Sequence, residues 1–182
     1  KGNEKIAYLT FDDGPNPSIT PKVLDILQKE DVKATFFVIG KNVDSYPDIV
    51  KRAYEEGHYI ANHGYDHNNN HLYKNNESFI NEVKNTDIAI GKAIGVDNYC
   101  AHVFRFPNGF MSPNNKSKKK EAASLLSQMN YTYIDWNCLN NDSVKKYNSS
   151  QLLNNLKKSS KNNANTRKTP KLENPIQDET EK

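Results

Sequence analysis

Cysteine and long hydrophobic runs are both scarce in this sequence of 182 residues. The two cysteines, Cys100 and Cys138, are too far apart to form a C-x-x-C metal-binding pair. No apolar run approaches the roughly 20 residues that a membrane-spanning helix needs. The sequence therefore predicts neither a cysteine-based metal site nor a membrane span.

A strong charge of either sign is also lacking. The chain has 25 Lys and Arg against 22 Asp and Glu, a net charge of +3. This weak balance argues against a dedicated nucleic-acid binder, and we expect a monomer without a nucleic-acid partner. The polar residues 1–5 run directly into the first expected strand and do not resemble a signal peptide or membrane anchor. We expect either a cytosolic protein or one whose export segment has been removed.

Apolar runs alternate with segments of helical periodicity along most of the chain. The runs predict strands at residues 6–11, 34–40, 58–62, 103–106 and 131–136. Helices are expected from Thr20 onward and at residues 46–56, 77–95 and 121–129. The first strand is nearly all apolar, which is typical of a buried parallel strand. This alternation predicts an α/β fold with a parallel sheet, either an open twisted sheet or a barrel.

The end of the sequence has a different composition. Between residues 157 and 182, only Ala164, Leu172 and Ile176 are apolar. So few apolar side chains cannot offset the entropy lost on folding. We therefore predict a domain over residues 1–156 and a disordered polar tail over residues 157–182, with no further strand in it.

Groups that can bind a metal follow two of the predicted strands. Asp12 and Asp13 come after the first strand, and His63 and His67 come after the third. The carboxyl ends of parallel strands meet at one edge of a sheet, and two imidazoles with one carboxylate form a catalytic zinc site that leaves a position open for water. Histidines in a polar loop are also often merely solvated. His67 and His71 have the same spacing as His63 and His67, so spacing alone does not choose between the two pairs.

Adjacent carboxylates at a strand end suggest a division of roles. Side chains of consecutive residues diverge, so one of Asp12 and Asp13 can bind a metal while the other faces the reacting centre. The alternative is conformational, because Asp-Asp-Gly-Pro is a common turn sequence. The residues alone do not decide between these interpretations.

Four ordered motifs resemble the polysaccharide deacetylases of carbohydrate esterase family 4, also called the NodB homology domain. They are Thr10–Pro15 (TFDDGP), His63–His67 (HGYDH), Arg105–Gly109 (RFPNG) and Asp135–Trp136. The resemblance covers about residues 5–156 and implies an irregular (β/α) barrel. It selects His63 and His67 as the pair and leaves His71 outside the site.

The resemblance implies a role for each matching residue. Asp13, His63 and His67 would bind Zn²⁺, or another divalent transition metal such as Co²⁺, and Asp12 would be the general base. A bound zinc ion brings the pKa of its water to about 7, which prepares the water to attack an acetamide carbonyl. Arg105 would orient Asp12; the alternative is an ordinary ion pair at a strand end.

Further residues of the motifs are implied in oxyanion stabilisation and substrate binding. The backbone N–H at Asn108 would stabilise the oxyanion, although many members have tyrosine at this position. Tyr65, Pro107 and Trp136 would contact the substrate. Two of these have alternatives: Tyr65 would otherwise cover the site, and Trp136 would otherwise belong to the core.

The family's fifth motif, which supplies a histidine that protonates the leaving amine, is missing. No histidine follows His102, so Asp135, which in the family positions that histidine, would lack its partner. A missing general acid typically lowers the rate by about 10²–10⁴. We therefore expect a C-terminally incomplete domain that lacks its last strands. An alternative source of the proton within this chain is His71 or His102.

These expectations lead to a metal-dependent hydrolase that removes acetyl groups from an N-acetylated amino-sugar polymer. Peptidoglycan is the expected polymer, because the Arg105–Gly109 motif and the Asp-Trp-Asn run resemble wall-modifying bacterial members. This substrate would place the protein outside the cell or at the cell wall. Open alternatives are chitin oligomers, O-acetyl xylan, and a noncatalytic remnant that binds metal or glycan. A metal-dependent phosphatase ranks lower, because the strand ends carry no Gly-rich phosphate loop.

Overall fold

A computed structural model of the chain describes residues 6–163, and these fall into two compact units. The first unit covers residues 6–134 and contains the whole sheet. The second unit covers residues 135–163. No helix within residues 6–163 is long and apolar enough to cross a membrane.

The first unit is built on a five-stranded sheet whose neighbouring strands are all parallel. The strands are β1 (Leu9–Gly14), β2 (Ala34–Val38), β3 (Tyr59–Asn62), β4 (Val103–Phe104) and β5 (Thr132–Tyr133). Their spatial order follows the chain without reversal, from β1 to β5. A doubly wound sheet reverses its order at a switch point, whereas a (β/α) barrel keeps consecutive strands adjacent. The predicted α/β fold with a parallel sheet is confirmed.

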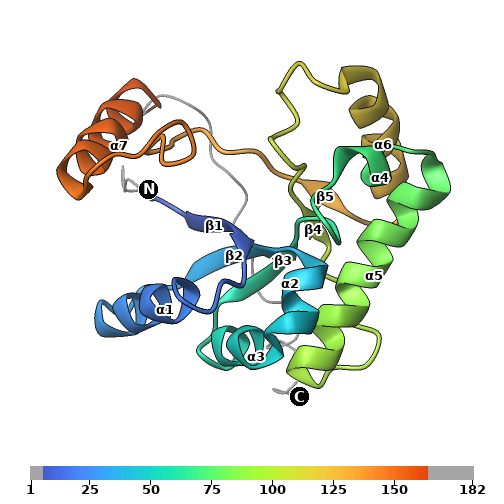
Figure 1. Cartoon of the computed structure of the whole chain (residues 1–182), viewed down its shortest axis with the longest axis horizontal. Helices are drawn as coiled ribbons and strands as arrows, with labels where there is room; N and C mark the ends of the chain where they lie inside the picture. The colour runs from blue at the N-terminus through green and yellow to red at the C-terminus, as the bar shows by residue number, and fades with distance from the viewer. Residues whose placement is uncertain (1–5, 164–182) are drawn as a thin grey trace, which may run out of the picture. The chain divides into compact units, whose positions relative to one another are not determined.

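Helices connect the strands and follow one another along the outside of the sheet (Figure 1). They are α1 (Thr20–Lys29), α2 (Gly40–Ser45), α3 (Pro47–Glu55), α4 (Asn69–Leu72), α5 (Asn76–Ile94) and α6 (Lys116–Gln128). Helices α1, α3 and α5 lie where the sequence predicts them, whereas α6 begins five residues before the predicted start at 121. The short helices α2 and α4 were not predicted, because they are too short to show helical periodicity.

The core divides along the two faces of β2. Ala34, Phe36 and Val38 pack against apolar side chains of α1, α3 and α5. Phe37, between them in sequence, points to the opposite face and is fully buried. A second, more aromatic cluster joins α5 to β4 and α6, with Phe79 and Phe104 in edge contact. These two clusters fix the strand ends that carry the motifs.

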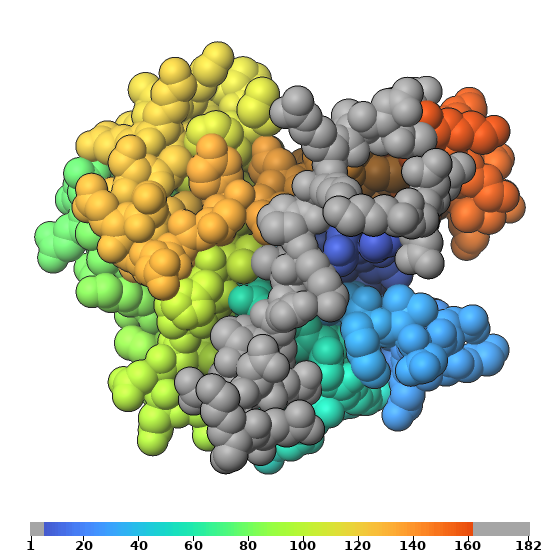
Figure 2. All heavy atoms as spheres, turned by 180° about the vertical axis from the view of Figure 1, so that it is seen from behind, coloured from blue at the N-terminus to red at the C-terminus, as the bar shows by residue number. Residues whose placement is uncertain are grey.

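The first strand differs from its prediction in both extent and burial. It begins at Leu9, and Tyr8 and Leu9 are 45% and 42% exposed. Atoms of this segment, in dark blue, are visible at the surface in Figure 2. Within the sheet of the described residues β1 pairs only with β2, so it is an edge strand. The expectation of a buried strand was wrong because an apolar sequence does not reveal how many neighbours a strand has.

The second unit contains one helix, α7 (Ser149–Asn163). Asn148 and Gln151 bind each other's backbone N–H at its start, and Ser159 accepts a hydrogen bond from the Leu139 backbone N–H. Residues 157–163, predicted as part of a disordered tail, therefore continue a helix. A helix satisfies its own backbone hydrogen bonds whatever the polarity of its side chains, which an argument from apolar composition alone overlooked. The rest of the predicted tail, residues 164–182, lies outside the described residues.

Candidate metal centre

Asp13 lies at a bulge in β1. Asp12 pairs with Phe37 and Gly14 with Val38, so Asp13 is the extra residue between two ladder positions. Its φ of 67° is in the left-handed region, which aspartate tolerates better than most residues. The bulge separates the directions of the two neighbouring carboxylates, as the sequence predicts, and gives each a different set of partners.

His63 follows β3 and is only 2% exposed. Its Nδ1 lies 2.7 Å from the backbone oxygen of Arg105. Since a carbonyl can only accept, Nδ1 carries a proton, and Nε2 is the nitrogen that faces the site. Metal-ligating histidines are usually held in this way by a second partner.

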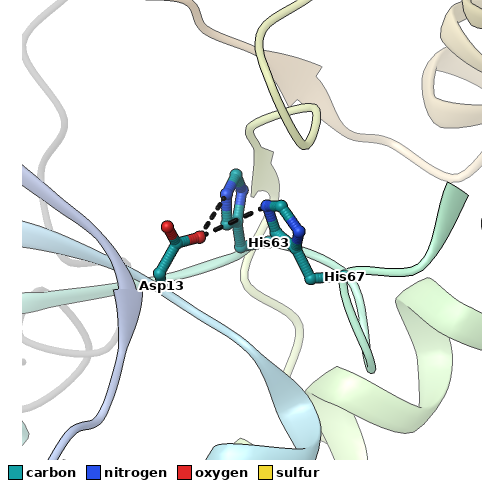
Figure 3. A group of neighbouring side chains, drawn as sticks. All are labelled: Asp13, His63 and His67. Carbon is teal, nitrogen blue, oxygen red and sulfur yellow. Dashed lines mark ion pairs between the residues drawn. The ribbon is translucent and has the colours of Figure 1, made fainter. Parts of the chain in front are cut away.

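The side chains of Asp13, His63 and His67 converge from two strand ends (Figure 3). Asp13 Oδ1 lies 3.2 Å from Nε2 of His63 and 3.3 Å from Nε2 of His67. The hydrogen bond with His63 lowers the pKa of Asp13; the charges of both imidazoles act in the same direction, and burial opposes them. One ligand atom from each residue lies within 4.8 Å of the others.

This donor set fits a divalent cation. Two imidazole nitrogens and one carboxylate oxygen are the ligands of catalytic zinc sites, and cobalt accepts the same atoms. His71 instead pairs with Asp66 through Nδ1, and its side chain is 62% exposed. The structure thus brings His63 and His67 to Asp13, as the family resemblance implies. That these three residues bind a metal stays a prediction.

Asp12 is held by a buried arginine. An Arg105 side-chain nitrogen (Nη1) donates to Asp12 Oδ1 at 2.6 Å and to Thr10 Oγ1 at 2.9 Å. Arg105 Nε donates to the backbone oxygen of Ile134 at 3.0 Å, and the guanidinium lies 3.9 Å above the ring of Phe37. Because the arginine is only 2% exposed, it is rigidly placed, unlike one in a surface ion pair. The structure pairs Asp12 with Arg105, and the predicted roles of the two residues stay predictions.

The third motif forms a tight turn at the end of β4. The Gly109 backbone N–H donates to the Phe106 oxygen at 2.7 Å, and Asn108 has a φ of 63°. Asn108 is exposed, whereas Pro107 is buried. The predicted oxyanion role of Asn108 and the predicted substrate contact of Pro107 stay predictions.

Tyr65 lies between the two candidate histidine ligands in the sequence. Its hydroxyl donates to Asp44 Oδ2 at 2.7 Å, and this hydrogen bond raises the pKa of Tyr65. Its ring packs so closely on Gly40 that a Cβ there would overlap it. Asp135 and Trp136 belong to the second unit, and Trp136 is 39% exposed. The predicted roles of all three motif residues stay predictions.

Two further histidines, His58 and His102, have partners outside the candidate donor set. His58 is 1% exposed, its Nδ1 accepts from the Ala34 backbone N–H, and burial lowers its pKa. His102 precedes β4, at the opposite end of this strand from Arg105, and its Nδ1 lies 3.0 Å from the Asn130 backbone oxygen.

Sequence reasoning missed the residues that hold the motif loops. Asn62 and Glu82 accept backbone N–H groups between His63 and His67, and Lys119 donates to backbone oxygens of the third motif's loop. Asn62 carried a usable signal, because it is a polar residue at the end of an apolar strand. Glu82 and Lys119 carried none, since each resembles a solvent-facing residue of its helix.

Comparison with known proteins identifies the family. A family model described as polysaccharide deacetylase matches residues 1–134. A peptidoglycan-N-acetylglucosamine deacetylase of Bacillus cereus is 37% identical over 143 residues, which are 78% of this chain and 50% of that protein. A chitooligosaccharide deacetylase of Rhizobium leguminosarum bv. trifolii is 44% identical over 91 residues, which are 50% of this chain and 42% of that protein.

The solved structures agree with the sequence comparisons. The catalytic domain of a peptidoglycan N-acetylglucosamine deacetylase from Eubacterium rectale matches with a TM-score of 0.77 and 28% identity, over 85% of this chain and 70% of that one. The chain thus spans about half the length of the Bacillus relative and about 70% of this catalytic domain. The family match covers most of the first unit, including the first three motifs: the chain belongs to the polysaccharide deacetylase family.

Proposed function

We propose that this chain is the metal-binding part of a hydrolase that removes acetyl groups from N-acetylated amino-sugar polymers, with peptidoglycan as its substrate. The observation that carries the proposal is the convergence of Asp13, His63 and His67 beside the Asp12–Arg105 pair. The names of the Bacillus and Rhizobium relatives support an amino-sugar substrate. Peptidoglycan lies outside the cell membrane, so we place the activity at the cell wall.

In the proposed reaction, Asp13, His63 and His67 would hold the cation, Zn²⁺ or Co²⁺. When bound, such an ion would supply Lewis-acid polarisation of the acetyl carbonyl and a lower pKa for water. Asp12 accepts a proton as water adds to the carbonyl carbon, and Arg105 keeps its carboxylate oriented. The C–N bond then breaks, the amine leaves with a proton, and acetate is released.

The turn of the third motif would stabilise the charge that develops on the acetyl oxygen. One backbone N–H donor of this kind is typically worth about 2.7–4 kcal/mol of barrier. We assign this donor to Asn108, whose position in an exposed turn after Arg105 supports the assignment. We assign substrate contacts to Tyr65 and Pro107, whereas the roles that the resemblance implies for Asp135 and Trp136, which belong to the second unit, stay predictions.

The proton for the leaving amine needs a donor. No histidine follows His102 in the 182 residues. His102 lies before β4, at the opposite end of this strand from Arg105, which argues against His102 as the proton donor. His71 is exposed and pairs with Asp66, the residue before His67. His71 is therefore the better candidate within this chain. If it is the acid, His71→Ala lowers acetate release, and an unchanged rate removes it.

The alternative to a hydrolase is a noncatalytic domain that binds metal or glycan. A matched pair of substitutions separates the two functions. Asp13→Asn is expected to weaken zinc binding, while Asp12→Asn is expected to keep zinc affinity and lower acetate release from N-acetylated peptidoglycan fragments. Isothermal titration and mass spectrometry of the glycan measure these effects.

The two candidate functions predict different results for the unsubstituted chain. A hydrolase removes acetyl mass in a zinc-dependent way, whereas a noncatalytic domain binds zinc and releases nothing above the metal-free control. A parallel assay on O-acetyl xylan tests the ester alternative. Failure to bind zinc at all would contradict the proposed function.

A further inference from the structure

The loop between the two candidate histidine ligands is attached to α5 by one carboxylate oxygen. Glu82 Oε2 accepts the backbone N–H of Tyr65 at 2.7 Å and that of Asp66 at 3.2 Å. Two consecutive N–H groups therefore point to a single acceptor on a neighbouring element. When the carboxylate is ionised these are charge-assisted hydrogen bonds, which are about twice as strong as neutral ones.

This loop needs support from outside. Gly64 and His67 have positive φ values of 83° and 57°, so the backbone between them is not stabilised by helix or strand hydrogen bonds. The Asn62 side-chain oxygen accepts the Gly64 backbone N–H at 2.9 Å. With the two hydrogen bonds to Glu82, three consecutive N–H groups have side-chain acceptors.

Helix α5 is held rigidly by the core and can fix the positions of the two acceptor side chains, Glu82 and Asn62. It is 19 residues long, is capped by Asn75 and Gly95, and contributes buried residues to both core clusters. The Asn62 side-chain nitrogen also donates to the Val83 oxygen of α5 at 2.9 Å. Both acceptors are thus fixed relative to the same helix.

From this geometry we infer that Glu82 is a positioning residue that sets the distance and orientation between His63 and His67 for metal binding. The inference rests on the proposed function, because it concerns the same metal centre. Glu82 itself accepts hydrogen bonds from the backbone at Tyr65 and Asp66 and lies outside the candidate donor set. It acts through the loop, in the way that residues behind metal ligands commonly do.

Three substitutions at Glu82 test this role. Glu82→Ala removes the acceptor, and Glu82→Asp withdraws it by one methylene while keeping the charge. Glu82→Gln keeps an oxygen at the same reach. Competition with a chromophoric chelator measures zinc affinity, and we expect a loss of about 10–100-fold for the Ala and Asp variants, typical of residues behind metal ligands. The Gln variant is expected to restore most of the affinity.

A control variant separates positioning from stability. Ile90 lies on the same helix and is fully buried in the first core cluster, away from the loop. Ile90→Ala is expected to lower the urea midpoint while the folded protein keeps its zinc affinity. If Glu82→Ala and Glu82→Asp lower the urea midpoint but bind zinc as tightly as the unsubstituted chain, the role is structural and the inference is wrong.

A second measurement needs no metal. Hydrogen exchange at the Tyr65 and Asp66 amides, followed by NMR on the metal-free chain, is expected to accelerate in the Ala and Asp variants and to stay slow in the Gln variant. Unchanged exchange in the Asp variant would overturn the inference while leaving the proposed function intact. Failure of the unsubstituted chain to bind zinc would instead contradict the proposed function. The comparison of exchange rates would still show whether Glu82 positions the loop.

Discussion

Two loops of the first unit are held by anchors of opposite charge. The loop of residues 63–67 directs backbone N–H groups to the carboxylate of Glu82. The loop of residues 106–112 directs backbone oxygens to Lys119, whose Nζ lies 2.6 Å from the Gly109 oxygen and 3.3 Å from the Ser112 oxygen. The acidic side chain thus faces the positive N–H ends of peptide groups, and the basic side chain faces their negative carbonyl ends.

The comparison shows how a helix can serve a neighbouring loop. Both anchors lie on helices that contact each other, Glu82 on α5 and Lys119 on α6. Irregular backbone cannot satisfy its own polar groups when it is buried, so a side chain from a regular element must do so. We expect the first loop to control metal binding and the second to control stability.

The largest effect is expected at Asn62, which links the first loop to α5 and is fully buried. Asn62→Leu leaves the Gly64 N–H, the Val83 oxygen and the Asp87 carboxylate each without one partner. At about 1–3 kcal/mol for each buried group, we expect a loss of about 4 kcal/mol in the free energy of unfolding. Urea denaturation measures this loss.

The matched control for this substitution is Asn85→Leu, at an exposed position of α5. We expect it to change the free energy of unfolding by less than about 0.5 kcal/mol. Similar losses in the two variants would show that the buried amide does not hold the loop.

The next effect concerns the anchor of the second loop. Lys119→Met removes the ammonium from the Gly109 and Ser112 oxygens, and we expect a loss of about 3 kcal/mol in the free energy of unfolding. Zinc affinity is expected to stay unchanged, because residues 106–112 contain none of the candidate metal ligands. Lys120→Met, at an exposed position, is the control. A weaker zinc affinity in Lys119→Met alone would erase the distinction between the loops.

A smaller effect separates backbone strain from metal binding. Gly64 and Gly95 have φ values of 83° and 73°, and a Cβ at either would meet no closer contact than 3.7 Å. Alanine at either position is expected to lower the free energy of unfolding by about 1 kcal/mol, the cost of a left-handed residue. Only Gly64→Ala is expected to weaken zinc binding as well, in the same chelator competition. Equal zinc affinity in both variants would contradict the expectation that the first loop controls metal binding.

The smallest effect is a pH dependence. Burial raises the pKa of Glu82, so the folded state binds its proton more tightly than the unfolded state does. Its contribution to stability is full below the unfolded pKa of about 4.3 and is lost as the pH rises through the folded pKa. Glu82→Gln does not ionise, so its stability relative to the unsubstituted metal-free chain should increase over this window. A difference that is constant from pH 4 to pH 7 would contradict this.

Elements with strong local signals were predictable from the sequence. The apolar runs located β2 and β3, and Gly95 marked the end of α5, where its φ of 73° terminates the helix. Strand-end geometry predicted that the aspartates and histidines lie near one another, because parallel strands place their carboxyl ends together. Only the family resemblance selected Asp13, His63 and His67 among them.

The anchors of the loops could not be predicted in this way. Glu82 lies 16 and 17 residues from its backbone partners. Lys119 is one of several lysines between Lys116 and Lys120, and only the packing of α6 decides which of them is buried. Such contacts depend on how elements pack, and neither composition nor periodicity records that packing.

Arg105 serves the two halves of the centre with different parts of its structure. Its guanidinium holds Asp12, and its backbone oxygen holds His63. Every amino acid has the carbonyl, whereas only arginine has that planar fork of donors. Replacing Arg105 would therefore disturb the position of Asp12 more than that of His63. If the proposed roles hold, a variant without the arginine would still bind the cation but lose turnover, so one substitution would separate metal binding from catalysis.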